Sequence, residues 1–301
     1  MPDRREFLRQ VAGAAVTGAL APISLAGEAS VRADEIKFGC AAITWGGNDE
    51  HAIDDISALG YAGIQLRTSV LKAYADRPAA LRDLLATRHL TFVALSSGNV
   101  PIDPAVEEKV IDEHLAHARF LRQAGGLYLQ LIDERPRGRA VEPGDYVRLG
   151  NLLTEIGKRV AEVGVQAVYH PHMGSIGEKP ADIDRVLDAT DPKYVPLLFD
   201  VAHYQAGGGD PVRAIHRYAG RIALLHIKDL RQPAHSAPFQ FVELGRGSVD
   251  LRGIFAALRA ERFKGWAIVE LDSVPEAGLS PKEAAAISKR YLEEKIGARI
   301  S

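Results

Sequence analysis

The sequence predicts a single (β/α)8 barrel. Short apolar segments alternate with segments of helical periodicity from residue 36 to about residue 292, and the alternation repeats eight times. This pattern is typical of a parallel sheet covered by helices, and eight repeats favour closure into a barrel over an open sheet. The first strand carries no GxGxxG motif, and the GGGD at 207–210 follows the sixth strand, so a dinucleotide-binding fold has little support.

The predicted strands are short, apolar almost throughout and rich in Val, Ile, Leu or aromatic residues, as strands buried on both faces should be. They span residues 36–45, 61–67, 91–96, 126–133, 165–170, 195–200, 222–228 and 266–271. Between them, the segment 104–124 repeats apolar residues at spacings of three and four, and Pro104 suits its first helical turn. Glycine often marks the turn from helix to strand, as at Gly60, Gly125 and Gly164.

Residues 1–33 differ in character from the rest of the chain. Arg4-Arg5 followed by Phe-Leu, a weakly apolar run and Val31-Arg32-Ala33 resemble a bacterial twin-arginine signal peptide. The apolar run is too short for a stable membrane span, which takes about 20 residues. This resemblance implies passage through the twin-arginine export machinery and a periplasmic protein whose barrel domain spans 34–301. Cleavage is expected after Ala33, and the sequence leaves open whether the segment is cleaved or kept as an N-terminal anchor. The alternative is a disordered N-terminal arm.

Composition excludes several classes of protein. The formal net charge is -2, with charges of both signs interspersed, so the basic face of a nucleic-acid-binding protein is absent. Cys40 is the single cysteine, which excludes a disulfide framework within the chain and thiolate-rich metal sites. Because Cys40 lies in the middle of a predicted strand, we expect it in the core. The sequence leaves open whether the protein is a monomer or a homo-oligomer.

Four residues of metal-ligand type lie at or near the ends of four successive predicted strands, where a barrel of this kind has its active site. They are His170, Asp200, His226 and Glu270. Singly, such a histidine is often a hydrogen-bonded structural residue, and such an aspartate is often a helix N-cap. Burying all four together costs several kcal/mol unless a cation compensates. Mixed nitrogen and oxygen donors suit Mn²⁺, Co²⁺, Fe²⁺ or Zn²⁺.

Motifs across the second half of the chain resemble the xylose isomerase-like superfamily of metal-dependent barrels, which includes sugar isomerases, ketose 3-epimerases and inosose dehydratases. The motifs are YHPHMGS (169–175), FDVAHYQAGGGDP (199–211), RIALLHIKDL (221–230), FVELGRGSVDL (241–251) and GWAIVELD (265–272). TWGGND (44–49) and YHPHMGS are most similar to the inosose dehydratase branch. The resemblance implies that His170, Asp200, His226 and Glu270 hold the metal and that the substrate is a small carbohydrate.

The sequence departs from the isomerase and epimerase branches at three positions. His170 stands where those branches usually have a glutamate, Gln65 stands where relatives often have Glu, and Arg246 occupies the variable position of ELGxG. Epimerisation needs two opposed acid–base groups, so a histidine at 170 favours β-elimination from a keto-sugar, keto-glycoside or inosose. The alternatives are a ketose 3-epimerase or a non-catalytic carbohydrate-binding barrel. Phosphodiester cleavage of the endonuclease IV kind would need more His and Glu ligands and a basic face.

Three residues are expected to take part in the chemistry. Lys228 lies two residues after His226 on the same side of its strand and is the candidate base or second electrophile. Its alternative role is an ion pair with Asp229 or another acid. His172 is expected to give a proton to the leaving oxygen, with support of the metal ligands as its alternative. Glu270 is counted with these catalytic residues as well as with the ligands.

Five residues are expected to bind substrate: His203, Glu243, Trp45, Gln130 and Gln65. For His203 the alternative is support of the metal ligands, and for Glu243 it is fixing its own loop. Trp45 either stacks on a sugar face or caps the core. Gln130 faces inward by the alternation of its strand.

Overall fold

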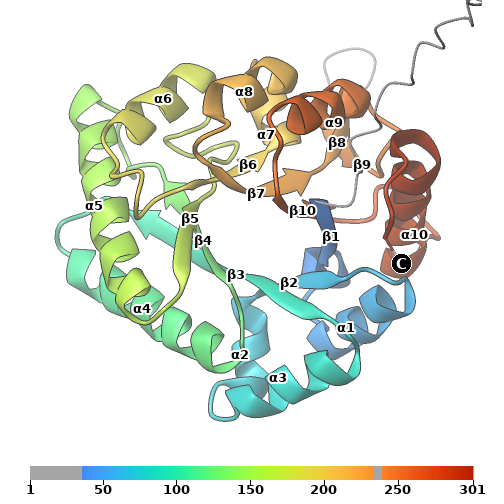
Figure 1. Ribbon diagram of the computed structural model, residues 1–301. Helices are drawn as coiled ribbons and strands as arrows, with labels where there is room; N and C mark the ends of the chain where they lie inside the picture. Colours follow the sequence, from blue (N-terminus) through green and yellow to red (C-terminus); the bar gives the residue numbers. More distant parts are fainter. Residues whose placement is uncertain (1–35, 233–238, 301) are drawn as a thin grey trace, which may run out of the picture. The chain divides into compact units, whose positions relative to one another are not determined.

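A computed structural model describes residues 36–232 and 239–300. Parallel strands close into a barrel in the order β1-β10-β7-β6-β5-β4-β3-β2 (Figure 1), which confirms the predicted fold. The barrel strands are β1 (Ile36–Ala41), β2 (Gly63–Arg67), β3 (Thr91–Pro101), β4 (Tyr128–Glu134), β5 (Gln166–Tyr169), β6 (Leu197–Asp200), β7 (Ile222–Ile227) and β10 (Gly265–Val269). The signal-peptide prediction for residues 1–33 lies outside the described residues.

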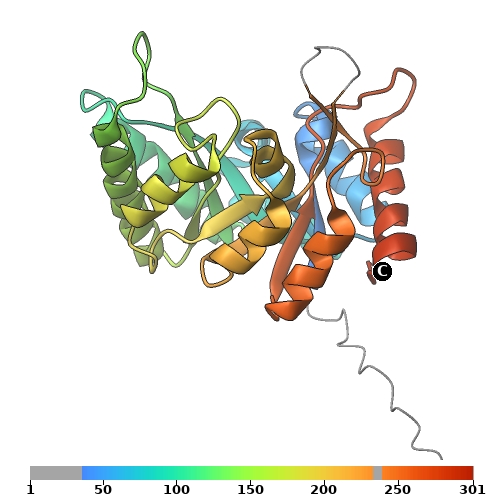
Figure 2. The same cartoon turned by 90° about the horizontal axis from the view of Figure 1, so that it is seen from above.

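Helices pack around the outside of the barrel (Figure 1, Figure 2). They are α1 (Asp49–Ala58), α2 (Leu71–Tyr74), α3 (Pro78–Thr87), α4 (Glu107–Gln123), α5 (Pro143–Glu162), α6 (Pro180–Asp188), α7 (Val201–Ala206), α8 (Pro211–Tyr218), α9 (Leu251–Ala260) and α10 (Pro281–Tyr291). Short 3-10 turns occupy Ala42–Trp45 and Thr68–Val70, and a π-helical turn follows α10 at Leu292–Ile296. Within the described residues, no helix combines the length and the apolar character that crossing a membrane requires.

The predicted elements need correction at several places. The third strand, predicted to end at residue 96, continues to Pro101. The first strand ends at Ala41, because the apolar residues 42–45 wind into a 3-10 turn instead of extending the strand. The predicted helix 104–124 begins only at Glu107, since residues 104–106 form a turn. A two-stranded antiparallel hairpin, β8 (Asp229–Arg231) and β9 (Gln240–Val242), follows β7 and was not predicted.

Side chains from the strands fill the barrel interior. Val93, Val168, Leu198, Leu224 and Trp266 are members of a buried cluster, and Leu198 and Leu224 are fully inaccessible. Gly63 is required here, because a Cβ at that position would lie 2.5 Å from side-chain atoms of Trp266 and Val93. Cys40 is buried in the hydrophobic core, as expected from its place in the strand. A binding site is therefore expected at the ends of the strands, outside this packed interior.

The helix-to-strand turns have the backbone that their glycines predicted. Gly60, Gly125 and Gly164 have φ angles of 81°, 78° and 79°, in the left-handed region that favours glycine. These turns lie where the strands begin, so residues that follow the strands gather at the opposite end of the barrel.

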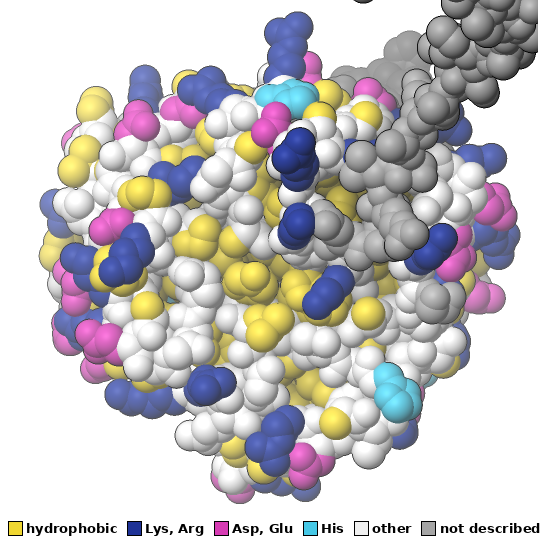
Figure 3. Space-filling model, viewed as in Figure 1, with side chains coloured by type: hydrophobic (Ala, Val, Ile, Leu, Met, Phe, Trp, Pro, Cys, Tyr) yellow, Lys and Arg dark blue, Asp and Glu magenta, His cyan; other side chains and the backbone are white. Residues whose placement is uncertain are grey.

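The face drawn in Figure 3 carries basic and acidic side chains interspersed around its rim and apolar side chains nearer its centre. The described side chains visible there form no continuous basic surface. This mixed distribution agrees with the interspersed charges of the sequence.

Candidate metal centre and active site

The four predicted ligands converge at the carboxyl ends of four adjacent strands. His170 directly follows β5, Asp200 ends β6, His226 lies in β7, and Glu270 directly follows β10. All four are buried, and one ligand atom from each lies within 4.8 Å of the others. The parallel barrel brings them together because neighbouring strands end at the same rim.

Unpaired lone pairs mark the centre of this cluster. His170 Nδ1, Asp200 Oδ2 and His226 Nδ1 are buried and have no hydrogen-bond partner. His226 Nδ1 lies 3.6 Å from Asp200 Oδ2 and 3.4 Å from Glu270 Oε1. Buried polar atoms without partners are costly, and three of them at one place fit a bound divalent cation.

The opposite atoms of these ligands are held by the protein. His226 Nε2 donates to Gln65 Oε1 at 2.9 Å, and Gln65 Nε2 donates to Gln130 Oε1 at 2.6 Å. This tautomer, assigned from the hydrogen-bond network, leaves His226 Nδ1 with a lone pair. Asp200 Oδ1 accepts from the backbone N–H groups of Ala202 and His203, both at 2.8 Å, so Oδ2 is available.

The protonation states suit metal ligation. Burial, with a further contribution from His226, lowers the pKa of His170 well below its ordinary value, so the imidazole is neutral. Burial alone would raise the pKa of Glu270, but the neighbouring His226 and Lys228 outweigh it and lower that pKa to about 2. The pKa of Asp200 is also held well below its usual range, against the effect of burial, by His203 and Lys228. Neutral imidazoles and ionised carboxylates are the forms that bind metal.

Lys228 lies beside the ligands and is fully buried. Its Nζ donates to Glu270 Oε1 at 3.0 Å and to Asp272 Oδ1 at 2.6 Å, and it lies 4.2 Å from the ring centre of Phe241. Burial opposes its charge, but Glu270, Asp200 and Asp272 together raise the pKa of Lys228 above its ordinary value. The ammonium group is therefore a fixed positive charge that donates to two carboxylates and lies 3.9 Å from a third, Asp200 Oδ2; none of the three is Asp229.

Asp229 instead holds the loop after β9. Its carboxylate accepts from the backbone N–H groups of Gly245 and Gly247, both at 2.9 Å, and of Val249 at 3.0 Å. The Asp229 side chain thus shapes the GRG segment that follows the hairpin.

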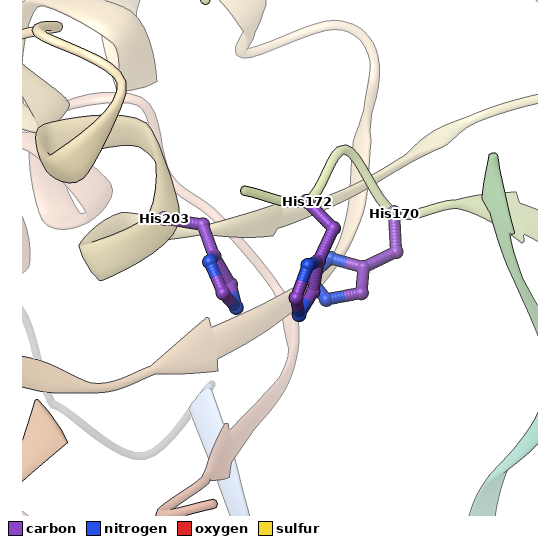
Figure 4. Close-up of side chains that lie close together, drawn as sticks. All are labelled: His170, His172 and His203. Carbon is purple, nitrogen blue, oxygen red and sulfur yellow. The ribbon is translucent and has the colours of Figure 1, made fainter. Parts of the chain in front are cut away.

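Two more histidines, His172 and His203, lie next to His170, and the three rings share one space (Figure 4). The His172 and His203 ring centres are 3.9 Å apart. His172 Nδ1 lies 2.7 Å from the Met173 carbonyl and donates to it, which leaves Nε2 as a possible acceptor. His203 is buried and its Nε2 lies 3.4 Å from Lys228 Nζ, so it connects the histidine group with the lysine.

A pocket of about 370 Å³ opens beside the cluster. Its wall includes the metal-site residues His170 and Glu270, and also His172, Gln65 and Gln130. A pocket of this size lies at the lower end of the usual range for small-molecule sites, about 300–1,000 Å³. The predicted roles of Gln65 and Gln130 as substrate contacts stay predictions, with Gln65 also positioning His226.

His203 is buried next to His172 and does not line this pocket, and two more predicted substrate residues lie away from the pocket wall. The Trp45 indole packs in the hydrophobic core and donates to Asp55 Oδ2 of α1 at 3.0 Å, because the chain turns after Ala41 and carries the ring outward. Glu243 is buried in the loop after β9, where Oε2 lies 3.3 Å from Arg246 Nη1 and Oε1 has no hydrogen-bond partner. The placement of both residues fits their alternative structural roles.

Among the pocket residues that sequence reasoning missed, three carry charges next to the predicted site: Asp272, Arg67 and Arg135. Asp272 follows Glu270 at a spacing of two, the same signal that identified Lys228 after His226, so it could have been found. Arg67 ends β2 and Arg135 follows β4, where surface arginines are common and give no distinct signal.

Comparisons with known proteins agree with this fold. The family model described as xylose isomerase-like TIM barrel matches residues 53–295. An inosose dehydratase of Lacticaseibacillus casei is 31% identical over 297 residues, covering 86% of this chain and 96% of its own.

Two solved structures share the fold. A probable 3-DHS dehydratase, AsbF, from Bacillus anthracis has a TM-score of 0.70 at 15% identity, covering 86% of this chain and 100% of its own. The IOLI protein with a bound zinc atom has a TM-score of 0.71 at 20% identity, covering 86% and 97%.

Proposed function

This chain belongs to the xylose isomerase-like TIM barrel family, and from that membership we propose that it is a metal-dependent lyase acting on a keto-sugar, keto-glycoside or inosose. The reaction is β-elimination, as in a dehydratase. The observation that carries the proposal is the buried group of His170, Asp200, His226 and Glu270 beside a pocket. Their ligand atoms lie within 4.8 Å of one another, and three of the four residues have a buried ligand atom without a hydrogen-bond partner. The inosose dehydratase relative, similar over nearly its whole length, supports elimination over epimerisation.

The four residues would hold one divalent ion, Mn²⁺, Co²⁺, Fe²⁺ or Zn²⁺. The ion would polarise the substrate carbonyl and so acidify the adjacent C–H bond. The zinc atom described for the IOLI protein supports a metal of this class.

Lys228 serves as a positive charge for the developing enolate. Its ammonium group is buried, and Glu270 and Asp272 keep it charged and in place. A preorganised charge in a buried site stabilises developing negative charge without rearrangement of solvent. Of its two predicted roles, base and electrophile, the raised pKa favours the electrophile.

His172 is the group that moves the proton. It lines the pocket, and its Nδ1 donates to the Met173 carbonyl, so Nε2 can take the proton on the carbon next to the carbonyl. The electron pair of that C–H bond forms a C=C bond, the β C–O bond breaks, and His172 returns the proton to the departing oxygen as water or an alcohol leaves. His203, in contact with the His172 ring, fixes its orientation.

Mass spectrometry of the products in deuterated water tests the proposal. The metal-loaded chain should convert an inosose or keto-sugar into a product lighter by one water, and the His172→Asn variant should lose this activity while it keeps the metal. A product of unchanged mass that carries deuterium would establish epimerisation instead. Absence of turnover on all three substrate classes would favour the carbohydrate-binding alternative.

We also propose that the protein is exported in folded form by the twin-arginine machinery. The paired Arg4-Arg5 and the small residue at Ala33 support this, and the single buried Cys40 means that folding needs no oxidising compartment. Fractionation of cells that express the chain should recover it in the periplasm. The matched variant Arg4→Lys with Arg5→Lys should hold it in the cytoplasm, and periplasmic recovery of both forms would contradict this route.

A further inference from the structure

A second groove, of about 540 Å³, adjoins the pocket that lies beside the candidate metal ligands. Its wall comes from the segment after β3, the segment after β4 and Arg148 of α5. We call it the arginine groove, after Arg135, Arg137, Arg139 and Arg148. Glu134 and Arg135 line both this groove and the pocket, so the two lie side by side.

One side of the arginine groove is apolar and stiff. It is formed by Pro101, Ile102, Pro104, Val106 and Pro136. Ile102 is buried and Val106 packs against the main core, so contacts with the core hold this wall in place. Proline has a fixed φ and no N–H group, so such a wall is preorganised and presents little to a sugar hydroxyl. A flat apolar group fits it better than a second hydrophilic ring.

The other side carries more basic than acidic side chains. Four arginines and two acids, Asp103 and Glu134, line the arginine groove. The Arg139 guanidinium group is already paired within the protein, because Nη1 and Nη2 donate to the two carboxylate oxygens of Asp145 at 2.6 and 2.8 Å. Arg135 is also held in place, donating to the Ser175 carbonyl and to Glu178.

Two arginines are available to a ligand. Arg137 meets Glu134 at 3.0 Å, but its side chain is 91% exposed, and ion pairs so exposed are weak because water competes for both partners. Arg148 is exposed and makes no hydrogen bond or ion pair with the residues that the structure describes; its charge acts on Asp145 through space. A guanidinium group binds carboxylate, sulfate and phosphate in two-point fashion, so this pair suits an anion.

We propose that the substrate is a keto-sugar extended by an apolar substituent that bears an anionic group, with the substituent in the arginine groove and the anion on Arg137 and Arg148. The proposal rests on the proposed function, since it takes the neighbouring pocket as the place of the chemistry. The shared pocket wall at Glu134 and Arg135 sets the point at which sugar and substituent join. The enzyme is thereby selective for a charged glycoside or ester over a free inosose.

The test uses two keto-glycosides that share the sugar and carry either a phenyl or a 4-carboxyphenyl aglycone. The wild-type chain should show kcat/KM about tenfold or more in favour of the carboxylated compound, mainly through KM. In the double variant Arg137→Gln with Arg148→Gln this ratio should fall by about tenfold. The control Arg82→Gln removes an exposed arginine beside Gly125, at the end where the strands begin, and should leave the ratio unchanged. Sulfate and phosphate analogues identify the preferred anion.

Calorimetry with the corresponding unreactive glycosides measures groove binding without turnover. Tighter binding of the carboxyphenyl glycoside, lost in the double variant, supports the arginine groove even if no keto-sugar is turned over; only the proposed function then fails. The groove proposal is overturned if the wild-type ratio of kcat/KM for the carboxyphenyl over the phenyl keto-glycoside is near one, or if the double variant leaves this ratio unchanged. Turnover of either compound would still support the proposed function. Equal binding of free benzoate and the carboxyphenyl glycoside also overturns it, because the groove would then be a separate anion site.

Discussion

Gln65 Oε1 lies 2.9 Å from His226 Nε2, and this contact across the barrel mouth turns the other nitrogen of His226 toward Asp200 and Glu270. Such contacts orient metal-bound histidines, and their loss commonly weakens metal affinity by about 10- to 100-fold. We expect this loss for Gln65→Leu, measured by competition with a chelator of known affinity.

The matched variant Gln65→Glu keeps an acceptor at the same place and should retain the metal. Unchanged affinity in Gln65→Leu would show that the Gln65 contact does not position His226.

Asp200 has two separate tasks, one for each oxygen. Oδ1 caps α7 and Oδ2 faces the metal site. In excess chelator, the free energy of unfolding of Asp200→Ala should lie about 1 kcal/mol below that of Asp200→Asn, which keeps a capping oxygen. Both variants should bind metal poorly, because alanine has no ligand atom and the amide of asparagine is a weaker ligand than a carboxylate. Urea denaturation checks the first statement; equal stability of the two variants would contradict the capping role.

The variant Lys228→Met tests the charge of Lys228 separately from the volume of its side chain. The methionine fills similar space but removes the ammonium group that faces Glu270 and Asp272. We expect kcat to fall on the order of 100-fold or more, because a preorganised charge is lost. Metal content by elemental analysis should stay near that of the wild type, and turnover near the wild-type rate would exclude Lys228 from the chemistry.

His114 gives stability a pH dependence that is separate from the metal. It is buried on α4, where Ser97 Oγ lies 2.7 Å from its Nδ1, and burial together with His117 lowers its pKa from 6.5 to about 4. Between pH 6.5 and about pH 4, His114 therefore binds more protons in the unfolded chain than in the folded chain. The free energy of unfolding is at its full value above pH 6.5 and decreases as the pH falls toward 4. The loss from this group is about 3 kcal/mol.

Urea denaturation across this pH range, with chelator present, should show a shallower decline for His114→Gln than for the wild type. His89→Asn, at an exposed site, should decline as the wild type does. Parallel curves for His114→Gln and the wild type would contradict the assignment.

The barrel and the convergence of His170, Asp200, His226 and Glu270 were predictable because both depend on regular patterns. A run of apolar residues identifies a buried strand, and an ionisable residue at its end is conspicuous. Asp200, which follows LLF, and His226, which follows IALL, could therefore be recognised in the sequence.

Other features depend on where the chain turns, which the pattern does not encode. Residues 42–45 continue the apolar run of β1 but leave the strand, which moves Trp45 from the expected pocket to a contact with Asp55. Both strands of the β8–β9 hairpin have only three residues, too few for an alternating pattern. The pairing of Lys228 with Asp272, rather than with the adjacent Asp229, is a contact between loops.

Elemental analysis of the purified chain, beside the variants Asp200→Ala and Glu270→Ala, tests the central claim most directly. We predict about one Mn, Co, Fe or Zn per chain in the wild type and its loss in both variants, since each removes one of four ligands. A wild-type chain that contains no such metal and cannot be reconstituted with any of the four would contradict the metal-dependent lyase.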